Sequence, residues 1–298
     1  MYNFALIGAA GYIAPRHLRA IKETGNNLVC ALDPYDGIGI LDSYFPDADF
    51  FTEPERFDRH LDKLRRRGAE KIDYVSICSP NYLHDAHIRM ALRNGAHAIC
   101  EKPLVLNPWN LDALQEIELE TGKKIYTILQ LRLHPAVQQL KKKIEEGPKD
   151  KVYEVDLTYI TSRGKWYFIS WKGDIQKSGG IATNIGIHFF DMLGWIFGDF
   201  KGVELGVNNP GKAGGKLFFE KANVNWILSV DASDLPAEIK QIQKRTYRKI
   251  TIEGEELEFS DGFTDLHTQS YEAILDGKGF GIEDARTSIE IVSNLRHL

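Results

Sequence analysis

The sequence is poor in cysteine and lacks both an excess of positive charge and a long apolar run. Its 298 residues include three cysteines, Cys30, Cys78 and Cys100, and no C-x-x-C pair. Each cysteine ends a short apolar segment, so we expect buried thiols rather than disulfides or a metal site. The 37 Lys and Arg against 42 Asp and Glu give a net charge of −5, which offers no basic surface to nucleic acid.

The chain also lacks the marks of a membrane or secreted protein. No apolar stretch reaches the ~18 residues that cross a bilayer, and the N-terminus has no basic signal-peptide start. We therefore expect a cytoplasmic protein. The 43% apolar and 27% charged residues are typical of globular proteins, and a length of about two ~150-residue domains predicts two cores.

Residues 1–129 alternate between short β-branched segments and helical ones, which is typical of a parallel sheet covered by helices. Strands are expected at 3–7, 28–32, 72–78, 97–100 and 124–129, and helices at 13–24, 54–68, 82–94 and 108–121. Four of the expected helices precede a glycine that can end them: Gly25, Gly68, Gly95 and Gly122. The sequence thus predicts a doubly wound α/β domain over residues 1–129.

The pattern changes after a helix expected at 135–146. Strands then follow one another with few helices between them, which favours a largely antiparallel sheet. The strands are expected at 152–160, 202–208, 215–220, 223–230, 247–252 and 255–259, and the helices at 182–197, 265–276 and 283–296. Residues 130–298 are therefore predicted to form a second, α+β domain with a large open sheet.

A glycine-rich turn, Gly8–Ala14, follows the first expected strand and opens a helix. Such a turn lets backbone N–H groups approach a pyrophosphate, although Ala10 stands at the second glycine position of the usual fingerprint. Asp33 ends the second strand, about 20 residues after Gly11, where an acid binds a ribose diol. A carboxylate there repels a 2′-phosphate, so NAD is favoured over NADP, with Asp36 as a second ribose ligand. The alternative is a tight turn with a surface acid.

Two further expected strand ends carry polar side chains at the same sheet edge, where ligands of open α/β sheets bind. One is Ser79-Pro80-Asn81 with His84, and the other is Glu101-Lys102-Pro103. Lys102, just past a buried strand, is well placed to face a nicotinamide.

These motifs, in this order, resemble the glucose-fructose oxidoreductase / inositol dehydrogenase (Gfo/Idh/MocA) family. Gly179–Asp191 is similar to the substrate-domain helix of that family, and Ile282–Arg286 to its C-terminal signature. The resemblance covers essentially the whole chain and implies a Rossmann domain, an open-sheet domain and hydride chemistry in the cleft between them. The residues expected to bind NAD are Gly8, Gly11, Tyr12, Ile13, Asp33, Asp36, Ser79, Asn81, His84, Glu101, Lys102 and Gln130.

One position departs from the family pattern. The family usually has Asp-x-x-x-His on the substrate-domain helix, and this chain has Asn184-x-x-x-His188. On an α-helix, a spacing of four places both side chains on one face, within reach of one substrate. Asn184 cannot supply a negative charge to a protonated His188, so we expect it to bind substrate hydroxyls. A packing role beside Phe189 and Phe190 is the structural alternative for His188.

Three segments, Thr158–Tyr167, Ser170–Asp174 and Phe263–Thr268, are similar to the subgroup that oxidises the 3-hydroxyl of UDP-N-acetylglucosaminuronic acid for bacterial surface polysaccharide. Cations suit the diphosphate and carboxylate of such a ligand, and flat rings suit its uracil or sugar. Residues 163–172 contain both cations and aromatic rings: Arg163, Lys165, Trp166, Tyr167, Trp171 and Lys172. The alternative is a charged loop after an exposed strand.

We expect Lys102 and His188 to be the catalytic residues. His188 is the first candidate base because an unperturbed imidazole has a pKa of ~6.5; Lys102 would stabilise the alkoxide or act as the base itself. Whether 2-oxoglutarate recycles NADH or NADH is released stays open. Another sugar or cyclitol dehydrogenase and a non-catalytic NAD-sensing protein are the rival functions. The family usually assembles through the open face of its second sheet, which implies a homodimer or tetramer.

Overall fold

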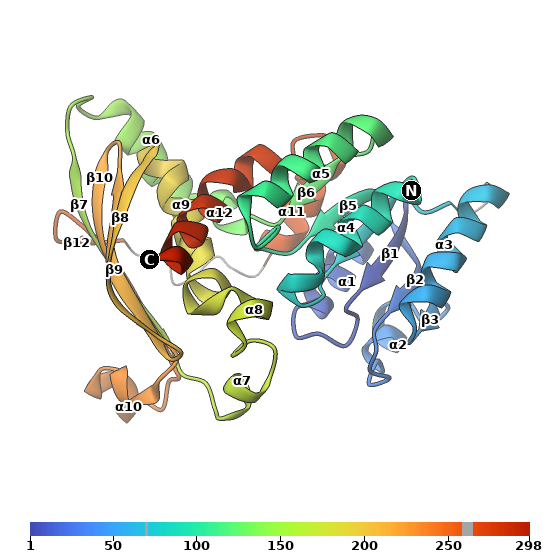
Figure 1. Ribbon diagram of the computed structural model, residues 1–298, viewed down its shortest axis with the longest axis horizontal. Helices are drawn as coiled ribbons and strands as arrows, with labels where there is room; N and C mark the ends of the chain where they lie inside the picture. The colour runs from blue at the N-terminus through green and yellow to red at the C-terminus, as the bar shows by residue number, and fades with distance from the viewer. Residues whose placement is uncertain (69–70, 258–264) are drawn as a thin grey trace. The chain divides into compact units, whose positions relative to one another are not determined.

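The computed structural model describes residues 1–68, 71–257 and 265–298, which group into two compact units (Figure 1). The first unit comprises Met1–Gln130 and Thr264–Ala285, and the second comprises Leu131–Phe263 and Arg286–Leu298. Residues 130–298 were predicted to form one domain. In the structure, helix α11 (Leu266–Leu275) belongs to the first unit instead, because its apolar side chains complete the core there.

The first unit contains a six-stranded sheet in the order β3-β2-β1-β4-β5-β6, in which every neighbouring pair is parallel. The strands are β1 (Asn3–Ile7), β2 (Asn27–Leu32), β3 (Asp49–Phe51), β4 (Tyr74–Ile77), β5 (His97–Cys100) and β6 (Ile125–Thr127). This is the Rossmann order, in which the direction of winding reverses between β1 and β4. The predicted fold class is confirmed, and the short edge strand β3 is an addition.

Helices follow the strands of this sheet. They are α1 (Ala14–Glu23), α2 (Ile40–Tyr44), α3 (Pro54–Arg67), α4 (His84–Arg93) after the 3-10 turn η1 (Asn81–Leu83), and α5 (Pro108–Thr121). Proline occupies the first turn of α1, α3 and α5, where its missing N–H costs nothing. Gly25, Gly68, Gly95 and Gly122 all have a φ between 65° and 79°, which confirms them as helix-ending glycines.

Helices α1 and α11 pack on each other against one face of the first sheet. Phe4 of β1 stacks on Tyr74 of β4 with ring centroids 5.1 Å apart, and on Tyr271 of α11 at 5.9 Å. Phe4 and Tyr271 are fully buried, so the C-terminal segment is part of the core of this unit. Each such aromatic pair stabilises the fold by roughly 0.5–1.5 kcal/mol beyond the effect of its buried area.

The second unit contains a sheet in the order β12-β11-β7-β10-β9-β8. Its strands are β7 (Tyr153–Thr161), β8 (Phe200–Asn209), β9 (Lys212–Phe219), β10 (Ala222–Ser229), β11 (Thr246–Ile252) and β12 (Glu255–Glu256). β7 and β10 are parallel, and all other neighbours are antiparallel, as predicted for a mostly antiparallel sheet. Positions 258 and 259 of the last expected strand lie outside the described residues.

The helical segments of the second unit vary more in length. They are η2 (Gln130–Leu133), α6 (Pro135–Glu146), α7 (Trp166–Ile169), α8 (Ile175–Ser178), the π-helical turn η3 (Ala182–Gly186), α9 (Ile187–Phe197), η4 (Ala232–Asp234), α10 (Ala237–Gln241) and α12 (Ile282–His297). Gln130 of η2 and the first residues of α12 belong to the first unit. No helix among the described residues is long and apolar enough to cross a membrane.

Helix α9 packs on one face of the second sheet. Phe189 lies 5.0 Å from Tyr159 of β7, and Phe190 lies 5.2 Å from Trp226 of β10, measured between ring centroids. The opposite face carries exposed polar pairs across strands, such as Asn225 of β10 donating to Asp156 of β7 at 3.0 Å. This is the alternation expected of an antiparallel sheet covered on one side.

Candidate functional site

The glycine-rich turn after β1 requires glycine at position 8. Gly8 has a φ of +89°, and a Cβ there would lie 2.6 Å from the carbonyl carbon of Cys78. At Gly11 a Cβ would lie 3.0 Å from the Gly8 oxygen. The turn therefore passes directly against the end of β4, at a distance that a side chain at position 8 would not allow.

Asp33 is locked to this turn. Its Oδ2 accepts the N–H of Ala10 at 2.9 Å, and its Oδ1 accepts the N–H of Tyr35 at 2.9 Å. The carboxylate is 5% exposed, so its direction is fixed by two backbone groups. Each oxygen keeps a second acceptor site, which suits a vicinal pair of ribose hydroxyls.

The remaining residues predicted around the dinucleotide turn differ in exposure. Tyr12 is 90% exposed, Asp36 is exposed, and Ile13 is half-buried against the first core. Ile13 precedes α1 and gives it no side-chain cap, and no acidic residue lies in the first turn of α1. The positive end of this helix dipole is thus left without a carboxylate of its own, as an anion site requires.

The segment after β4 is held by its own histidines. The Ser79 hydroxyl lies 2.8 Å from Nδ1 of His87, and Asn81 begins η1 at 5% exposure. The His84 ring lies 2.8 Å from the Ser79 carbonyl and 2.7 Å from the Pro103 carbonyl. Only an imidazolium has N–H groups on both nitrogens, but burial lowers the pKa of His84. The two carbonyl oxygens act in the opposite direction and favour the protonated ring.

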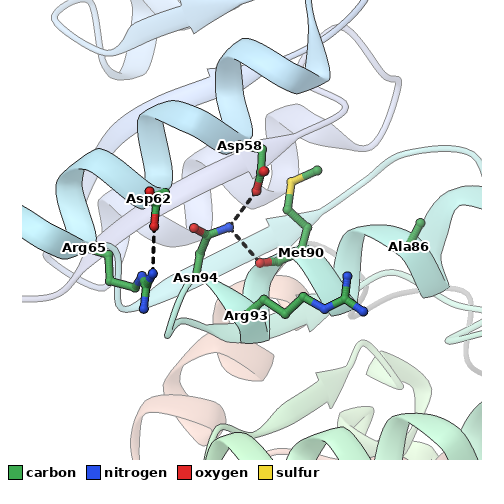
Figure 2. A pocket seen from close by; sticks show the side chains of 7 residues that line it. All are labelled: Asp58, Asp62, Arg65, Ala86, Met90, Arg93 and Asn94. Atoms are coloured by element: carbon green, nitrogen blue, oxygen red, sulfur yellow. Dashed lines mark hydrogen bonds and ion pairs between the residues drawn. The ribbon is translucent and has the colours of Figure 1, made fainter.

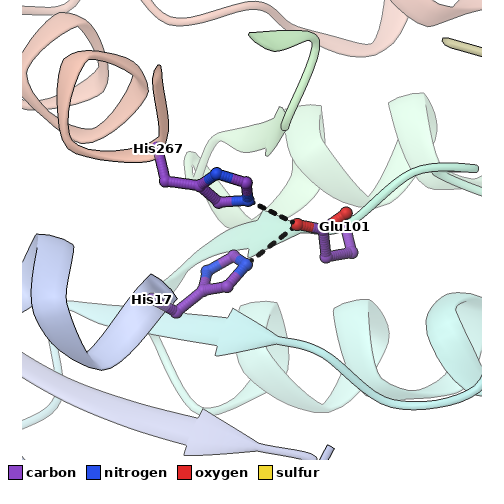
Figure 3. A group of neighbouring side chains, drawn as sticks. All are labelled: His17, Glu101 and His267. Carbon is purple, nitrogen blue, oxygen red and sulfur yellow. Dashed lines mark hydrogen bonds and ion pairs between the residues drawn. The ribbon is translucent and has the colours of Figure 1, made fainter. Parts of the chain in front are cut away.

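Glu101 and Lys102 directly follow β5. Lys102 is half-buried, and its backbone N–H donates to Glu101 Oε2 at 3.3 Å, ahead of a cis peptide bond to Pro103. The Glu101 carboxylate is 6% exposed and lies between His17 of α1 and His267 of α11 (Figure 3). Among the described residues, these three side chains alone bring enough candidate ligand atoms together for a metal ion, within 4.8 Å.

Gln130 ends the first unit and carries a buried amide oxygen. The residue is half-buried, and its Oε1 accepts no hydrogen bond from any residue that the structure describes. A buried amide oxygen left unsatisfied costs roughly 1–3 kcal/mol, so a bound donor group would restore it. Together with Gly8, Asp33 and the open N-terminus of α1, this orphan oxygen fits a dinucleotide.

The predicted anion segment of the second unit runs through α7. Arg163 and Lys165 are exposed, Trp166 is 52% exposed, and Tyr167 is buried at 1%. Lys172 Nζ lies 4.2 Å from the centroid of the Trp171 ring. Burial, together with the nearby Arg163, lowers the pKa of Lys172. A half-buried lysine repelled by a neighbouring arginine favours a bound anion.

The structure joins Asn184 to Tyr167, because the Asn184 amide donates to the Tyr167 hydroxyl at 3.2 Å. Burial raises the pKa of that hydroxyl. Asn184 lies in the π-helical turn η3, and His188 lies half-buried in the first turn of α9. The helix expected over 182–197 is present, but its first turn is π-helical, so the one-face argument for positions 184 and 188 does not hold as stated.

Gly186 explains part of this local geometry. A Cβ at this position would lie 2.6 Å from the Leu228 side chain of β10 and 2.9 Å from the Phe190 ring. The backbone of η3 thus approaches the sheet more closely than any other residue would allow. Phe263 and Thr264 of the third predicted substrate segment lie outside the described residues.

Sequence reasoning missed a buried ion pair near this helix. Arg132 of η2 donates to Asp191 of α9 at 2.7 and 3.1 Å, and both side chains are at most 7% exposed. The Arg132 guanidinium also lies 5.9 Å from the centroid of the Trp195 ring. The sequence did contain a signal for this ion pair. Asp191 is the one acidic residue in the apolar segment 187–197, and a carboxylate buried among apolar side chains needs a partner.

A surface hollow of about 400 Å3 lies elsewhere on the first unit (Figure 2). Its lining comes from α3 and α4 and includes none of the predicted site residues. Its polar groups already bind one another, as Arg65 does to Asp62 at 2.7 Å and Asn94 to Asp58 at 2.8 Å. We therefore locate the candidate site at the strand ends and not in this hollow.

Comparison with known proteins agrees with both halves of the chain. Residues 2–128 match the family described as "Oxidoreductase family, NAD-binding Rossmann fold", and residues 141–225 match "Oxidoreductase family, C-terminal alpha/beta domain". D-glucoside 3-dehydrogenase of Escherichia coli is 29% identical over 130 residues, which are 44% of this chain and 37% of that protein. The chain spans about a third to a half of the length of the first curated relatives it matches.

Solved structures agree over the full length. A WlbA (WbpB) dehydrogenase from Thermus thermophilus in complex with NAD and alpha-ketoglutarate has a TM-score of 0.96 and 53% identity, covering 100% of this chain and 96% of that one. The same enzyme in complex with NAD and UDP-GlcNAcA has a TM-score of 0.96 and 52% identity, covering 100% and 95%. The WlbA dehydrogenase from Bordetella pertussis, at 19% identity and a TM-score of 0.79, shares the fold.

Proposed function

The chain belongs to the Gfo/Idh/MocA oxidoreductase family, and on this basis we propose that it oxidises the sugar 3-hydroxyl of UDP-N-acetylglucosaminuronic acid to a ketone, with NAD as the oxidant. The observation that carries this proposal is the 52–53% identity over the whole chain to a dehydrogenase crystallised with NAD and UDP-GlcNAcA. The keto sugar would serve bacterial surface polysaccharide synthesis. An acidic chain without a membrane-spanning helix among its described residues suits a cytoplasmic enzyme.

NAD, when bound, supplies the acceptor for a hydride. The chain's contribution is to bind it at the turn Gly8–Ile13, with the pyrophosphate near the uncapped N-terminus of α1 and the ribose hydroxyls on Asp33. The buried Oε1 of Gln130 would accept one hydrogen bond from the cofactor. The charge of Asp33 favours NAD over NADP.

The substrate carries two phosphates and a carboxylate, and the second unit offers matching charge. We assign Arg163, Lys165 and Lys172 to these anions and the exposed face of Trp166 to the base or sugar. An anion beside Lys172 offsets both its burial and its repulsion from Arg163. Asn184 then holds a sugar hydroxyl while its amide stays tied to Tyr167.

Removal of the hydroxyl proton falls to His188 or Lys102. His188 would accept it as a base, with Lys102 donating a hydrogen bond to the developing alkoxide; with the roles exchanged, Lys102 is the base. Lys102→Ala and His188→Ala should each abolish most turnover while NAD binding, measured by fluorescence titration, persists. Lys149→Ala, on an exposed turn, is the matched control. Normal turnover in both site variants would refute the assignment.

The reduced cofactor must be reoxidised, because alcohol oxidation by NAD is uphill near neutral pH. We propose that 2-oxoglutarate does this in place, since the Thermus relative was crystallised with NAD and alpha-ketoglutarate. Incubation of purified enzyme with UDP-sugar acid and 2-oxoglutarate, without added NAD, should yield 2-hydroxyglutarate and a keto sugar by mass spectrometry. A strict requirement for added NAD with no hydroxyglutarate would refute recycling.

Two rival functions and the assembly state are tested by the same preparation. Another sugar or cyclitol dehydrogenase would turn over free sugars without needing Arg163 or Lys172, and an NAD-sensing protein would bind NAD with no turnover. We propose assembly as a homodimer or tetramer through the polar face of the second sheet, which carries Asn225 and Asp156. Light scattering of the protein and of Asn225→Arg should show an oligomer in the first and its loss in the second.

A further inference from the structure

Two buried histidines, His17 and His267, are not used in the function proposed above. His17 Nε2 and His267 Nε2 each lie 3.0 Å from the same oxygen, Oε1 of Glu101 (Figure 3). The three residues come from α1, the end of β5 and α11, and each is at most 6% exposed. A carboxylate oxygen accepts, so both imidazoles donate through Nε2–H.

The second nitrogen of His17 extends the cluster inward. Its Nδ1 lies 2.7 Å from the Tyr271 hydroxyl, which in turn lies 2.6 Å from the Ser76 hydroxyl of β4. Burial lowers the pKa of His17, so the ring is neutral, donates through Nε2 and accepts from Tyr271 through Nδ1. One chain of hydrogen bonds therefore fixes both the tautomer and the tilt of the ring.

Glu101 is thereby kept charged inside the protein. Burial alone would raise its pKa, but the hydrogen bonds from His17 and His267 hold that pKa well below the ordinary value. The other carboxylate oxygen, Oε2, accepts the backbone N–H of Lys102 at 3.3 Å. The carboxylate thus connects two helices to the backbone of the residue proposed to act on the substrate hydroxyl.

We infer that His17 and His267 are positioning residues for Lys102, acting through the Glu101 carboxylate that they share. Each supplies one N–H to Oε1, and the fixed carboxylate holds the Lys102 backbone at Oε2. The inference rests on the proposed function, because it assigns meaning to the place of Lys102. It also gives a reason for the segment Leu266–Thr268, which returns from the C-terminal part of the chain to the sheet edge of the first unit.

This positioning role requires an N–H donor at the place of His267 Nε2. A purely structural role would require only a side chain of similar size. A glutamine at position 267 can present an amide N–H near the place of Nε2, whereas leucine fills space without a donor and asparagine is polar but too short. His97, at the start of the same strand β5, accepts the Lys124 N–H through Nδ1 and does not touch Glu101. It serves as the control for loss of a histidine side chain outside the cluster.

The experiment compares His267→Leu, His267→Asn and His267→Gln with His97→Gln in the full chain. We expect kcat for UDP-sugar acid oxidation to fall about 10- to 100-fold in the Leu and Asn variants, the range for a misplaced catalytic group, with NAD affinity unchanged. His267→Gln should recover most of the loss, and His97→Gln should match the wild type. The Asn variant keeps the test valid if Leu fails to fold.

A second readout needs no turnover. Competitive labelling of lysines with acetic anhydride, followed by peptide mass spectrometry, reports the reactivity of Lys102 relative to Lys149. Labelling of Lys102 should rise in His267→Leu and return to the wild-type level in His267→Gln. If the wild type has no dehydrogenase activity, the proposed function fails and this measurement alone decides the positioning role. Unchanged kcat and labelling in the Leu variant, or equal loss in Leu and Gln, would overturn it.

Discussion

Removing the charge of Asp191 should destabilise the second unit, because it leaves the Arg132 guanidinium buried without its counter-ion. The pair makes two hydrogen bonds, at 2.7 and 3.1 Å, and its side chains are 7% and 3% exposed. Loss of one partner of such a pair costs about 3–5 kcal/mol. Asparagine keeps one acceptor oxygen and the Trp195 contact stays, so we expect Asp191→Asn to lie near the lower end of that range.

The expected shift is large enough to measure by unfolding. For a unit of about 150 residues, ~2–4 °C per kcal/mol converts a loss of about 3 kcal/mol to a fall in Tm of about 6–12 °C. Tryptophan fluorescence is the appropriate probe, because Trp166, Trp171, Trp195 and Trp226 all belong to this unit. Urea unfolding gives the free energy by an independent route.

Two further variants separate charge burial from simple damage. Asp199→Asn alters an exposed carboxylate, 83% exposed in its side chain, and should leave Tm unchanged. The double variant Arg132→Met with Asp191→Leu removes both charges and should recover most of the loss, since apolar pairs often replace buried ion pairs at no net cost. A fall of less than about 1 kcal/mol in Asp191→Asn, or a double variant as unstable as the single one, would refute the reasoning.

Three further predictions concern the first unit. Burial lowers the pKa of His87 from 6.5 to about 4. As the pH falls, the unfolded ring is protonated before the folded one, so the free energy of unfolding should fall by about 3 kcal/mol between pH 6.5 and 4. Urea unfolding of His87→Gln should show a flatter pH profile, and the same profile as the wild type would contradict this cause. Gly8→Ala forces a Cβ to 2.6 Å from the Cys78 carbonyl carbon at a φ of +89°, so NAD binding measured by titration should be lost; wild-type affinity would contradict the tight turn. Asp33→Asn removes the charge that we propose to bind the ribose and to repel a 2′-phosphate. NAD should then bind about 10-fold more weakly while NADP gains relative to it, and an unchanged ratio of NAD affinity to NADP affinity would contradict this role.

The elements with strong local signals were predictable from the sequence. α5 begins at Pro108 and ends before Gly122 as expected, because proline and glycine restrict the backbone without help from distant residues. The edge strand β3 was missed because three residues are too few for a periodic pattern. The π-helical turn was missed because it depends on the close approach of Gly186 to Leu228 of β10, a contact between segments distant in sequence.

The same division applies to the candidate site. Asp33 could be located from its distance to Gly11, since a strand, a turn and a helix fix that spacing. The partners of Glu101 could not, because His17 and His267 are separated by most of the chain and have no shared motif. Tyr167 and Asn184 were both proposed for the substrate, but the hydrogen bond between them follows only from the packing of α7 against η3.

The return of α11 to the first sheet has a consequence for how the protein is made. Tyr271 and Ile274 belong to the core cluster that otherwise comes from residues 4–128. A ribosome that adds 5–20 residues per second needs about 7–27 s to pass from residue 130 to residue 264. During that interval the first unit is emerging without the side chains of α11 in its core, so its final folding must follow the synthesis of the second unit rather than precede it.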